Sequence, residues 1–351
     1  MRNFLVVIAL VLSSLFVLGQ QKTEAFSNVN FPINARTAAL GGKIVAADFS
    51  DPQMASAAPQ LISGMEKGSV NFQTLFLPNG LKSTDASYLF KVKDLPFTFL
   101  AGARLFSFGP MDQTDEFGNV NGNFTPRDQV LYVSAGYNRP GPWQYGASLK
   151  FLNSTYEVYT ANALAMDLGV AYVDTVKQFS AGAQLSNAGI MLSNYLDARQ
   201  KLPVNFAMGI SKKLDKAPFR FLFTMDNLQQ WEIELPEDTE VKRDPLTGED
   251  LPPEEKSSMG RFFRNFTRHI YAGSEIVFSQ NFQIRVGYNY LRRKELSIAE
   301  KPGTVGLSWG LGFKINRFHI HYANSRFHLA GGAHFFSVTT NINNFWTRKQ
   351  L

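Results

Sequence analysis

The sequence predicts an all-β protein, a transmembrane antiparallel β-barrel of about 14 strands with an N-terminal plug segment of helical or irregular structure. Three observations support this class. Segments of strand length alternate between large apolar and small polar residues, their connections are alternately short and long, and only one N-terminal stretch is continuously apolar. The hydrophobic fraction of 44% and the mean hydropathy of −0.14 are too polar for a bundle of membrane-spanning helices.

Residues 4–18 form the apolar N-terminal stretch, which follows Arg2 and is shorter than the roughly 20 residues of a spanning helix. This pattern predicts a secretory signal peptide over residues 1–19, cleaved before Gln20. The chain contains no cysteine, so we expect neither a lipid anchor on the new N-terminus nor a disulfide. Residues 20–66 are then expected to form an N-terminal periplasmic or plug segment, and residues 67–351 the outer-membrane barrel.

Alternation with a period of two is clear over residues 143–151, where Trp143 and Leu149 share one face and Gly146 and Ser148 share the other. A soluble sandwich alternates too, but its solvent face usually carries more Lys, Glu and Thr. We therefore expect the large residues to face lipid and the small ones to line a crowded aqueous lumen. The same pattern recurs over residues 164–172, 282–290 and 305–313.

The connections between these segments provide a second, independent signal. The longest are residues 109–127, 187–202 and 228–266, and they alternate with short turns such as 93–94 and 215–216. Bacterial barrels have short periplasmic turns and long outer loops. The long loops are therefore expected at the cell surface and both termini in the periplasm. The expected strands are residues 68–77, 83–93, 97–108, 128–138, 143–155, 161–173, 178–187, 202–214, 217–228, 267–279, 282–291, 304–315, 317–325 and 332–344.

Residues 31–62 do not alternate. They are rich in Ala and punctuated by Gly, with Pro59 near the end, which indicates short helical turns rather than strands. Such a segment could remain a periplasmic leader or enter the lumen as a plug. The residues that we assign to a plug are Arg36, Leu40, Gly41, Gly42, Asp48 and Pro59.

The run at residues 35–42, the acidic turn after it and the exit Pro59-Gln60-Leu61 resemble the N-terminal signature of the FadL-like and PorV-like barrels. Within that group the chain is most similar to the PorQ family of the type IX secretion system. The similarity runs from about residue 26 to the C-terminus, with one departure: the usual Asn-Pro-Ala is Ala58-Pro59-Gln60 here. The segments that carry the PorQ resemblance are residues 112–119, 165–169, 209–214 and 217–221.

The resemblance implies a non-enzymatic membrane anchor that holds a PorZ-like surface protein. That protein would work in an attachment complex with a PorU-like sortase and a PorV-like barrel, which joins secreted cargo to lipopolysaccharide. We expect the partner at the loop 109–127, because its aromatic residues have no obvious core to enter; the alternative is a solvated loop. The expected partner-binding residues are Asp112, Asp115, Glu116, Phe117, Asn119 and Phe124.

The loop 228–266 is divided by charge, with an acidic first part and a basic second part that includes Phe262, Phe263 and Phe266. A basic and aromatic pattern can bind nucleic acid, but the export signal argues against that partner. Above the outer leaflet, the cations could instead pair with lipopolysaccharide phosphates; a solvated loop is the alternative. The expected lipopolysaccharide-binding residues are Lys256, Arg261, Arg264 and Arg268.

Three patterns that suggest catalysis or metal binding have simpler explanations. Residues 306–310 match G-x-S-x-G, but they lie within one expected strand rather than at a strand-to-helix turn. His319 and His321 share a strand face without a nearby set of carboxylates or cysteines. The acidic residues of the loop 112–119 do not have the spacing of a calcium loop. We therefore expect no catalytic residues, no bound metal and no cofactor.

Two other functions remain open. A FadL-type transporter of hydrophobic small molecules would show an apolar lumen cavity and a lateral gap, often marked by a kinked strand. A general porin would show an open channel, which residues 31–62 are suited to block.

Overall fold

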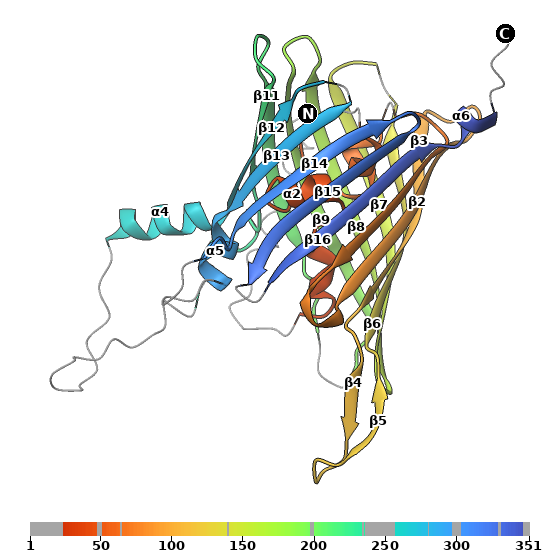
Figure 1. Cartoon of the computed structure of the whole chain (residues 1–351), viewed down its shortest axis with the longest axis vertical. Coiled ribbons are helices and arrows are strands. Elements are labelled where there is room, and N and C mark those ends of the chain that lie inside the picture. Colours follow the sequence, from red (N-terminus) through yellow and green to blue (C-terminus); the bar gives the residue numbers. More distant parts are fainter. Residues whose placement is uncertain are drawn as a thin grey trace, which may run out of the picture.

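The main body of the computed structural model is a closed barrel of 14 antiparallel strands (Figure 1), which confirms the predicted fold class. The structure describes residues 24–47, 51–63, 65–138, 140–196, 200–233, 235, 257–279, 281–296, 303–328 and 331–346. The barrel strands are β1 (Ser69–Phe76), β2 (Lys82–Lys91), β3 (Phe97–Ser107), β6 (Arg127–Tyr137), β7 (Trp143–Tyr156), β8 (Tyr159–Asp174), β9 (Phe179–Ser193), β10 (Asn205–Lys213), β11 (Phe219–Met225), β12 (Ile270–Val277), β13 (Phe282–Asn289), β14 (Leu307–Ile315), β15 (Phe318–His328) and β16 (Gly331–Asn341).

Each barrel strand pairs with the barrel strands before and after it in sequence, and β1 pairs with β16 to close the ring. The expected and observed strand bounds differ most at β9, which was expected to end at residue 187 but continues to Ser193. Asn187 has a φ of 58°, and the register between β8 and β9 shifts near it. This bulge interrupts the alternation, which is why the sequence pattern ended the strand too early.

The long connections gather at one end of the barrel and the short turns at the other (Figure 1). We call these the outer end and the periplasmic end. At the outer end lie the hairpin of β4 (Met111–Thr114) and β5 (Val120–Phe124) and the helices α4 (Ser258–Arg268) and α5 (Tyr290–Leu296); α6 (Asn343–Trp346) lies at the periplasmic end.

The barrel wall is uneven. Strands β6 to β9 have 11 to 16 residues, whereas β11, β12 and β13 have 7 or 8. The wall of β6 to β9, the long wall, therefore reaches further toward the β4–β5 hairpin than the short wall of β11 to β13 (Figure 1).

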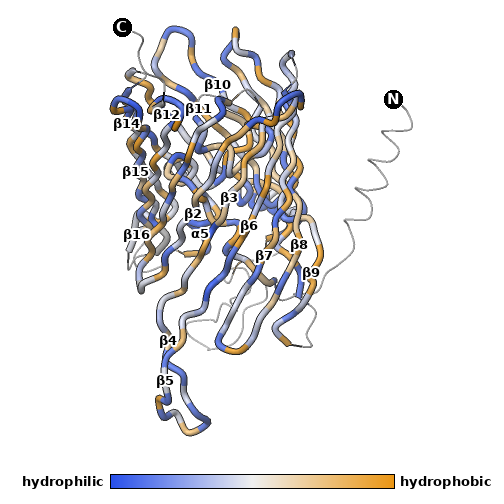
Figure 2. Tube along the Cα trace, turned by 90° about the vertical axis from the view of Figure 1, so that its right-hand side faces the viewer, coloured by the Kyte–Doolittle hydropathy of each residue, from blue (hydrophilic) through white to orange (hydrophobic). Residues whose placement is uncertain are grey.

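The outward side chains of the strands are large, apolar and exposed, as predicted. Leu149 and Leu168 are examples, and their neighbours Ser148 and Asp167 are buried on the inner side. An apolar outer surface on a closed barrel is a lipid-facing surface. Figure 2 shows how apolar and polar residues alternate along the strands. Within the described ranges, no helix is long and apolar enough to cross a bilayer.

Residues 24–47 and 51–63 lie in the lumen, and we call them the plug (Figure 1). Its helix α2 (Ala35–Ala39) packs on β13 to β16, and the 3-10 helix η4 (Pro59–Leu61) packs on β6, β7 and β8. The Asn34 side chain caps α2 by accepting from the Thr37 N–H. The other short 3-10 helices are η2 (Ser27–Asn30) and η3 (Pro52–Ser56) in the plug and η5 (Pro78–Gly80) after β1.

The plug crosses the lumen from the outer end to the periplasmic end. Near its start, the Ala25 N–H donates to the Lys201 carbonyl at 3.0 Å, in the long loop between β9 and β10. Its end leads to Ser69, the first residue of β1. The expectation that both termini lie in the periplasm is therefore wrong for the described N-terminal residues. Loop lengths give the direction of the strands only, and the plug is not a strand.

Candidate functional site

Inward-facing glycines of the barrel wall make room for the main chain of the plug. A Cβ on Gly146 would lie 2.1 Å from the Pro59 carbonyl oxygen, and one on Gly287 would lie 2.4 Å from the Gly41 nitrogen. The small inner face was expected to border an aqueous lumen; at this level it packs against the plug instead. We call these positions the glycine belt: Gly136, Gly146, Gly169, Gly182, Gly273, Gly287 and Gly310.

A buried ion cluster ties the plug to β11, β12 and β13. Arg36 makes two hydrogen bonds to the Glu275 carboxylate, at 2.7 and 2.8 Å, and lies 3.4 Å from Asp51. Glu275, which is 0% exposed, also pairs with Arg285 at 2.7 Å and Arg220 at 3.1 Å. Buried charges are tolerated only when paired and hydrogen-bonded, so removal of one partner typically costs about 3–5 kcal/mol. We call this set the Arg36 cluster.

The turn after α2 is held against β12 and β13. Leu40 is buried beside Gly273, Gly41 has a φ of 107° and Gly42 a φ of 128°. The Asn289 amide donates to the Gly41 carbonyl at 3.1 Å. The structure therefore places the expected plug residues Arg36, Leu40, Gly41, Gly42 and Pro59 in the lumen. Asp48 lies outside the described residues.

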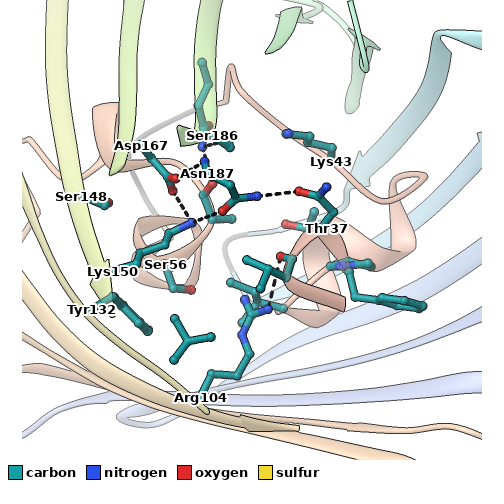
Figure 3. Close-up of a pocket in the computed structure, with 18 of the residues that line it drawn as sticks. Thr37, Lys43, Ser56, Arg104, Tyr132, Ser148, Lys150, Asp167, Ser186 and Asn187 are labelled. Carbon is teal, nitrogen blue, oxygen red and sulfur yellow. Dashed lines mark hydrogen bonds and ion pairs between the residues drawn. The ribbon is translucent and has the colours of Figure 1, made fainter. Parts of the chain in front are cut away.

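A small cavity of about 70 Å³ remains between the plug and the inner side of β3 and β6 to β9 (Figure 3). Its lining is mixed, with Phe31 and Ile44 on the side of the plug. On the barrel wall, Lys150 lies 2.6 Å from Asp167 and donates to the Asn187 side chain at 3.0 Å. Asn187 in turn donates to Asn30 of the plug at 2.9 Å. A cavity that binds benzene in another protein measures about 150 Å³ and is apolar. This cavity is therefore too small for an aromatic hydrocarbon.

The sequence did not single out these cavity residues. Lys150 and Asp167 were visible as isolated charges on otherwise small strand faces, and this was the only available signal. Their pairing requires the register of β7 and β8, in which Ser148 faces Asp167 and Lys150 faces Ala165.

A second recess, of about 330 Å³, lies at the outer mouth of the barrel. The Tyr195 hydroxyl donates to Ser154 at 2.5 Å, and Ser154 donates to Asp128. The recess was not expected, because its aromatic residues come from four separate segments. Its aromatic side chains are Phe26, Phe108, Tyr156, Tyr159 and Tyr195.

The loop 109–127, expected as a long outer loop, contains the β4–β5 hairpin, which projects from the outer end (Figures 1 and 2). Asp115 shapes its turn by accepting from the N–H groups of Phe117 and Asn119, at 2.9 and 2.8 Å. Hydrogen bonds from Asn119 and then from the backbone lower the pKa of Asp115. Phe117 is 89% exposed. Asp112, Glu116 and Asn119 are exposed and Phe124 is half-buried.

The basic residues expected to bind lipopolysaccharide are not equivalent. Arg261 is exposed and Arg264 half-buried on α4. Arg268 is only 3% exposed and donates to the Ile233 carbonyl at 2.7 Å. The assignment of Arg268 to lipid phosphates is therefore wrong, because the last turn of α4 packs on the protein. Lys256 lies outside the described residues.

The G-x-S-x-G match was expected inside one strand, but Gly306 lies in the turn before β14 and only residues 307–310 belong to the strand. Ser308 is buried and donates to the Ala39 carbonyl at 3.0 Å, so it fixes the plug. His321 is buried, with its Nδ1 2.8 Å from an Arg285 nitrogen. Among the described residues, no three His, Cys, Asp or Glu side chains are grouped so that they could hold a metal ion.

Comparison with known proteins supports the fold. No family model and no curated protein matches the sequence. Several solved structures match over most of both chains. A TodX monoaromatic hydrocarbon channel mutant has a TM-score of 0.54 and 12% identity, covering 89% of this chain and 99% of its own. The toluene transporter TbuX of Ralstonia pickettii has a TM-score of 0.51 and 13% identity, covering 90% and 100%. The CymD monoaromatic hydrocarbon channel has a TM-score of 0.50 and 14% identity, covering 91% and 99%.

The closed barrel, its lipid-facing surface and these matches define an integral outer-membrane β-barrel. More particularly, this 14-strand barrel has the overall fold of the monoaromatic hydrocarbon channels and the toluene transporter compared above. At this level of identity the likeness concerns the fold, and function has to be argued from the site.

Proposed function

We propose that this chain is a sealed, non-enzymatic outer-membrane barrel that anchors a surface protein. On the basis of the sequence resemblance, the partner that we propose is a PorZ-like protein. It would act in a type IX attachment complex with a PorU-like sortase and a PorV-like barrel. The observation that carries the proposal is a contrast: the lumen is filled by a tightly bound plug, whereas an ordered hairpin with an aromatic tip projects outward.

The seal supports an anchor rather than a channel. The plug main chain lies directly on the glycine belt, and the Arg36 cluster holds α2 to the wall with fully buried ion pairs. The strand ladder is closed around the barrel, with a bulge rather than a gap at Asn187. Passage of a small molecule would require the loss of several of these contacts at once.

The β4–β5 hairpin supports a partner surface. Phe117, Val120 and Met111 are exposed apolar residues on one short hairpin. Exposed apolar groups that lack a core of their own often mark interfaces, and aromatic residues are frequent hot spots. The Asp115 hydrogen bonds fix the turn before binding, which lowers the entropy lost on association.

The test uses Phe117→Ala combined with Val120→Ala. We expect the barrel to remain folded and the PorZ-like protein to appear in the medium, with cargo no longer attached to the surface. Val176→Ala is the matched control, because Val176 is also 89% exposed but lies at a periplasmic turn. Deletion of residues 109–127 is the stronger version. If the deletion leaves the surface protein cell-bound, the hairpin is not the anchor.

A transporter of hydrophobic small molecules is the second candidate, and the comparisons by themselves favour it. The matching structures are described as hydrocarbon channels and a toluene transporter. The aromatic recess at the outer mouth and the kink of β9 at Asn187 are features that a transporter could use. The small volume of the cavity between plug and wall, about 70 Å³, argues against it.

Uptake of radiolabelled toluene by proteoliposomes distinguishes the two candidates. An anchor predicts uptake equal to that of empty vesicles. A transporter predicts uptake that rises with the amount of barrel and falls when Tyr195→Ala alters the recess, together with normal retention of the surface protein in cells.

A further inference from the structure

Helix α4 has an apolar stripe that is exposed. Residues spaced three and four apart lie on one face of a helix. On α4 these are Met259, Phe262, Phe263 and Phe266. Met259 is 64% exposed and Phe263 57%. The opposite face is polar and carries Arg261, Arg264, Asn265 and Arg268.

The polar face is the one that contacts the protein. Asn265 and Arg268 are buried, and Arg268 donates to the Ile233 carbonyl. Phe262 makes a ring contact with Trp231, at 5.5 Å between ring centroids, but Met259 and Phe263 remain uncovered. This is the reverse of a helix on a soluble protein, which buries its apolar stripe. The exposed stripe therefore needs an apolar environment that the described part of the chain does not supply.

The position of α4 identifies that environment. The helix ends two residues before Ile270, the first residue of β12. At the same outer strand ends, Tyr288 of β13 pairs with Leu307 of β14, and both side chains are exposed on the lipid-facing surface. In Figure 1, α4 runs sideways from the wall rather than along the barrel axis. Its C-terminal end meets the edge of the lipid-facing surface, where the headgroup region is expected.

We propose that α4 is an interfacial helix that lies in the outer leaflet, with Met259, Phe262 and Phe263 inserted among the lipid acyl chains. Amphipathic helices of this kind bury their apolar face roughly 5–10 Å into the boundary between headgroups and acyl chains. Arg261 is exposed on the other face, and its guanidinium suits a lipid phosphate. The proposal applies whether the barrel anchors a protein or transports a small molecule.

The short wall gives α4 a structural role there. Strands β11, β12 and β13 have 7 or 8 residues, fewer than the roughly 9–11 of a typical spanning strand. The outer rim of the short wall therefore lies closer to the middle of the membrane than the outer rim of the long wall. A helix lying in the headgroup region covers this rim with an apolar surface.

The absence of cysteine from the chain allows a direct test with single spin labels. Phe263→Cys and Arg261→Cys are labelled separately, and the barrel is reconstituted in vesicles of phosphatidylethanolamine and phosphatidylglycerol. Collision rates are measured with oxygen, which concentrates among acyl chains, and with a water-soluble nickel chelate. We expect the oxygen-to-nickel ratio at residue 263 to exceed that at residue 261 severalfold. Val176→Cys, at a periplasmic turn, provides the reference for water.

Two results would overturn the proposal. Equal ratios at residues 263, 261 and 176 would mean that α4 lies in water. Protection of residue 263 from both reagents would mean that α4 packs on protein. Resistance to unfolding in an unheated gel verifies each labelled barrel, and Met259→Cys, on the same stripe, serves in place of residue 263 if that variant does not fold.

Discussion

The two sides of the barrel hold the plug by different kinds of contact. On the side of β11 to β13, packing on glycines is joined by a buried ion cluster of Arg36, Glu275 and Arg285. On the side of β6 to β8, the contact is steric: the Pro59 main chain lies on Gly146 and the Gln60 side chain lies on Gly169. Close packing tolerates no added volume, whereas an ion cluster tolerates changes of shape but not of charge. The comparison therefore predicts that the side of β11 to β13 is sensitive to the loss of charge, whereas the side of β6 to β8 is sensitive to added volume.

The largest effect is expected from Gly146→Leu on the long wall. A Cβ at this position would already overlap the Pro59 carbonyl, so η4 must leave the wall or the barrel must fail to close. We expect loss of the heat-resistant folded form or, in barrels that do fold, ion conductance in planar bilayers. The control is Ala147→Leu, one residue away on the outward face. Equal assembly and equal tightness of both variants would refute steric attachment.

Glu275→Ala should be the next most severe change. It leaves Arg36 and Arg285 buried without their main partner, and such a loss typically costs about 3–5 kcal/mol. Urea unfolding of the barrel in detergent measures this cost. Glu275→Gln keeps the shape without the charge. If it unfolds like the unaltered barrel, charge does not hold this side of the plug.

The outer surfaces of the two walls can be compared with Leu168→Arg and Val286→Arg. A cation on the lipid face costs roughly 2–4 kcal/mol at mid-membrane and less near an interface. Strand β8 has 16 residues and β13 has 8, so the middle of β13 is closer to headgroups. We expect Leu168→Arg to lower stability in lipid vesicles more than Val286→Arg. The reverse order would contradict the inferred difference in depth.

The smallest effect concerns the hairpin that extends the long wall. The pKa of Asp115 is lowered by hydrogen bonds from Asn119. A carboxyl group with a lowered pKa stabilises the folded turn above its unfolded pKa, and this contribution disappears as the pH falls through the folded pKa. The Asn119 amide signal in NMR spectra should therefore stay unchanged at neutral pH and shift only below the usual range for Asp. Asp115→Asn should remove the acid transition while the barrel stays intact.

The sequence predicted the strands of the barrel wall better than the contacts of the plug inside it. A period of two identified all 14 barrel strands and the alternation of loop lengths gave their direction, because side-chain facing and turn length are local properties. The glycines of the inner face were visible, but not what they contact. Arg36 and Glu275 are separated by 239 residues, so nothing local links them. The part of β9 after Asn187 was not predicted, because a bulge there breaks the alternation that locates strands. The burial of Arg268 could not be predicted either, because it depends on a hydrogen bond to the distant Ile233 carbonyl.

The path of the plug also constrains the order of assembly. The described chain enters at the outer mouth near Lys201 and leaves at Ser69, where β1 pairs with β16. A segment that runs the whole length of a closed cylinder cannot easily be threaded through it afterwards. The pairing of β1 with β16 must therefore form last, around a plug that already lies in the lumen. Until β16 has been inserted, the machinery that assembles the barrel has to keep it open.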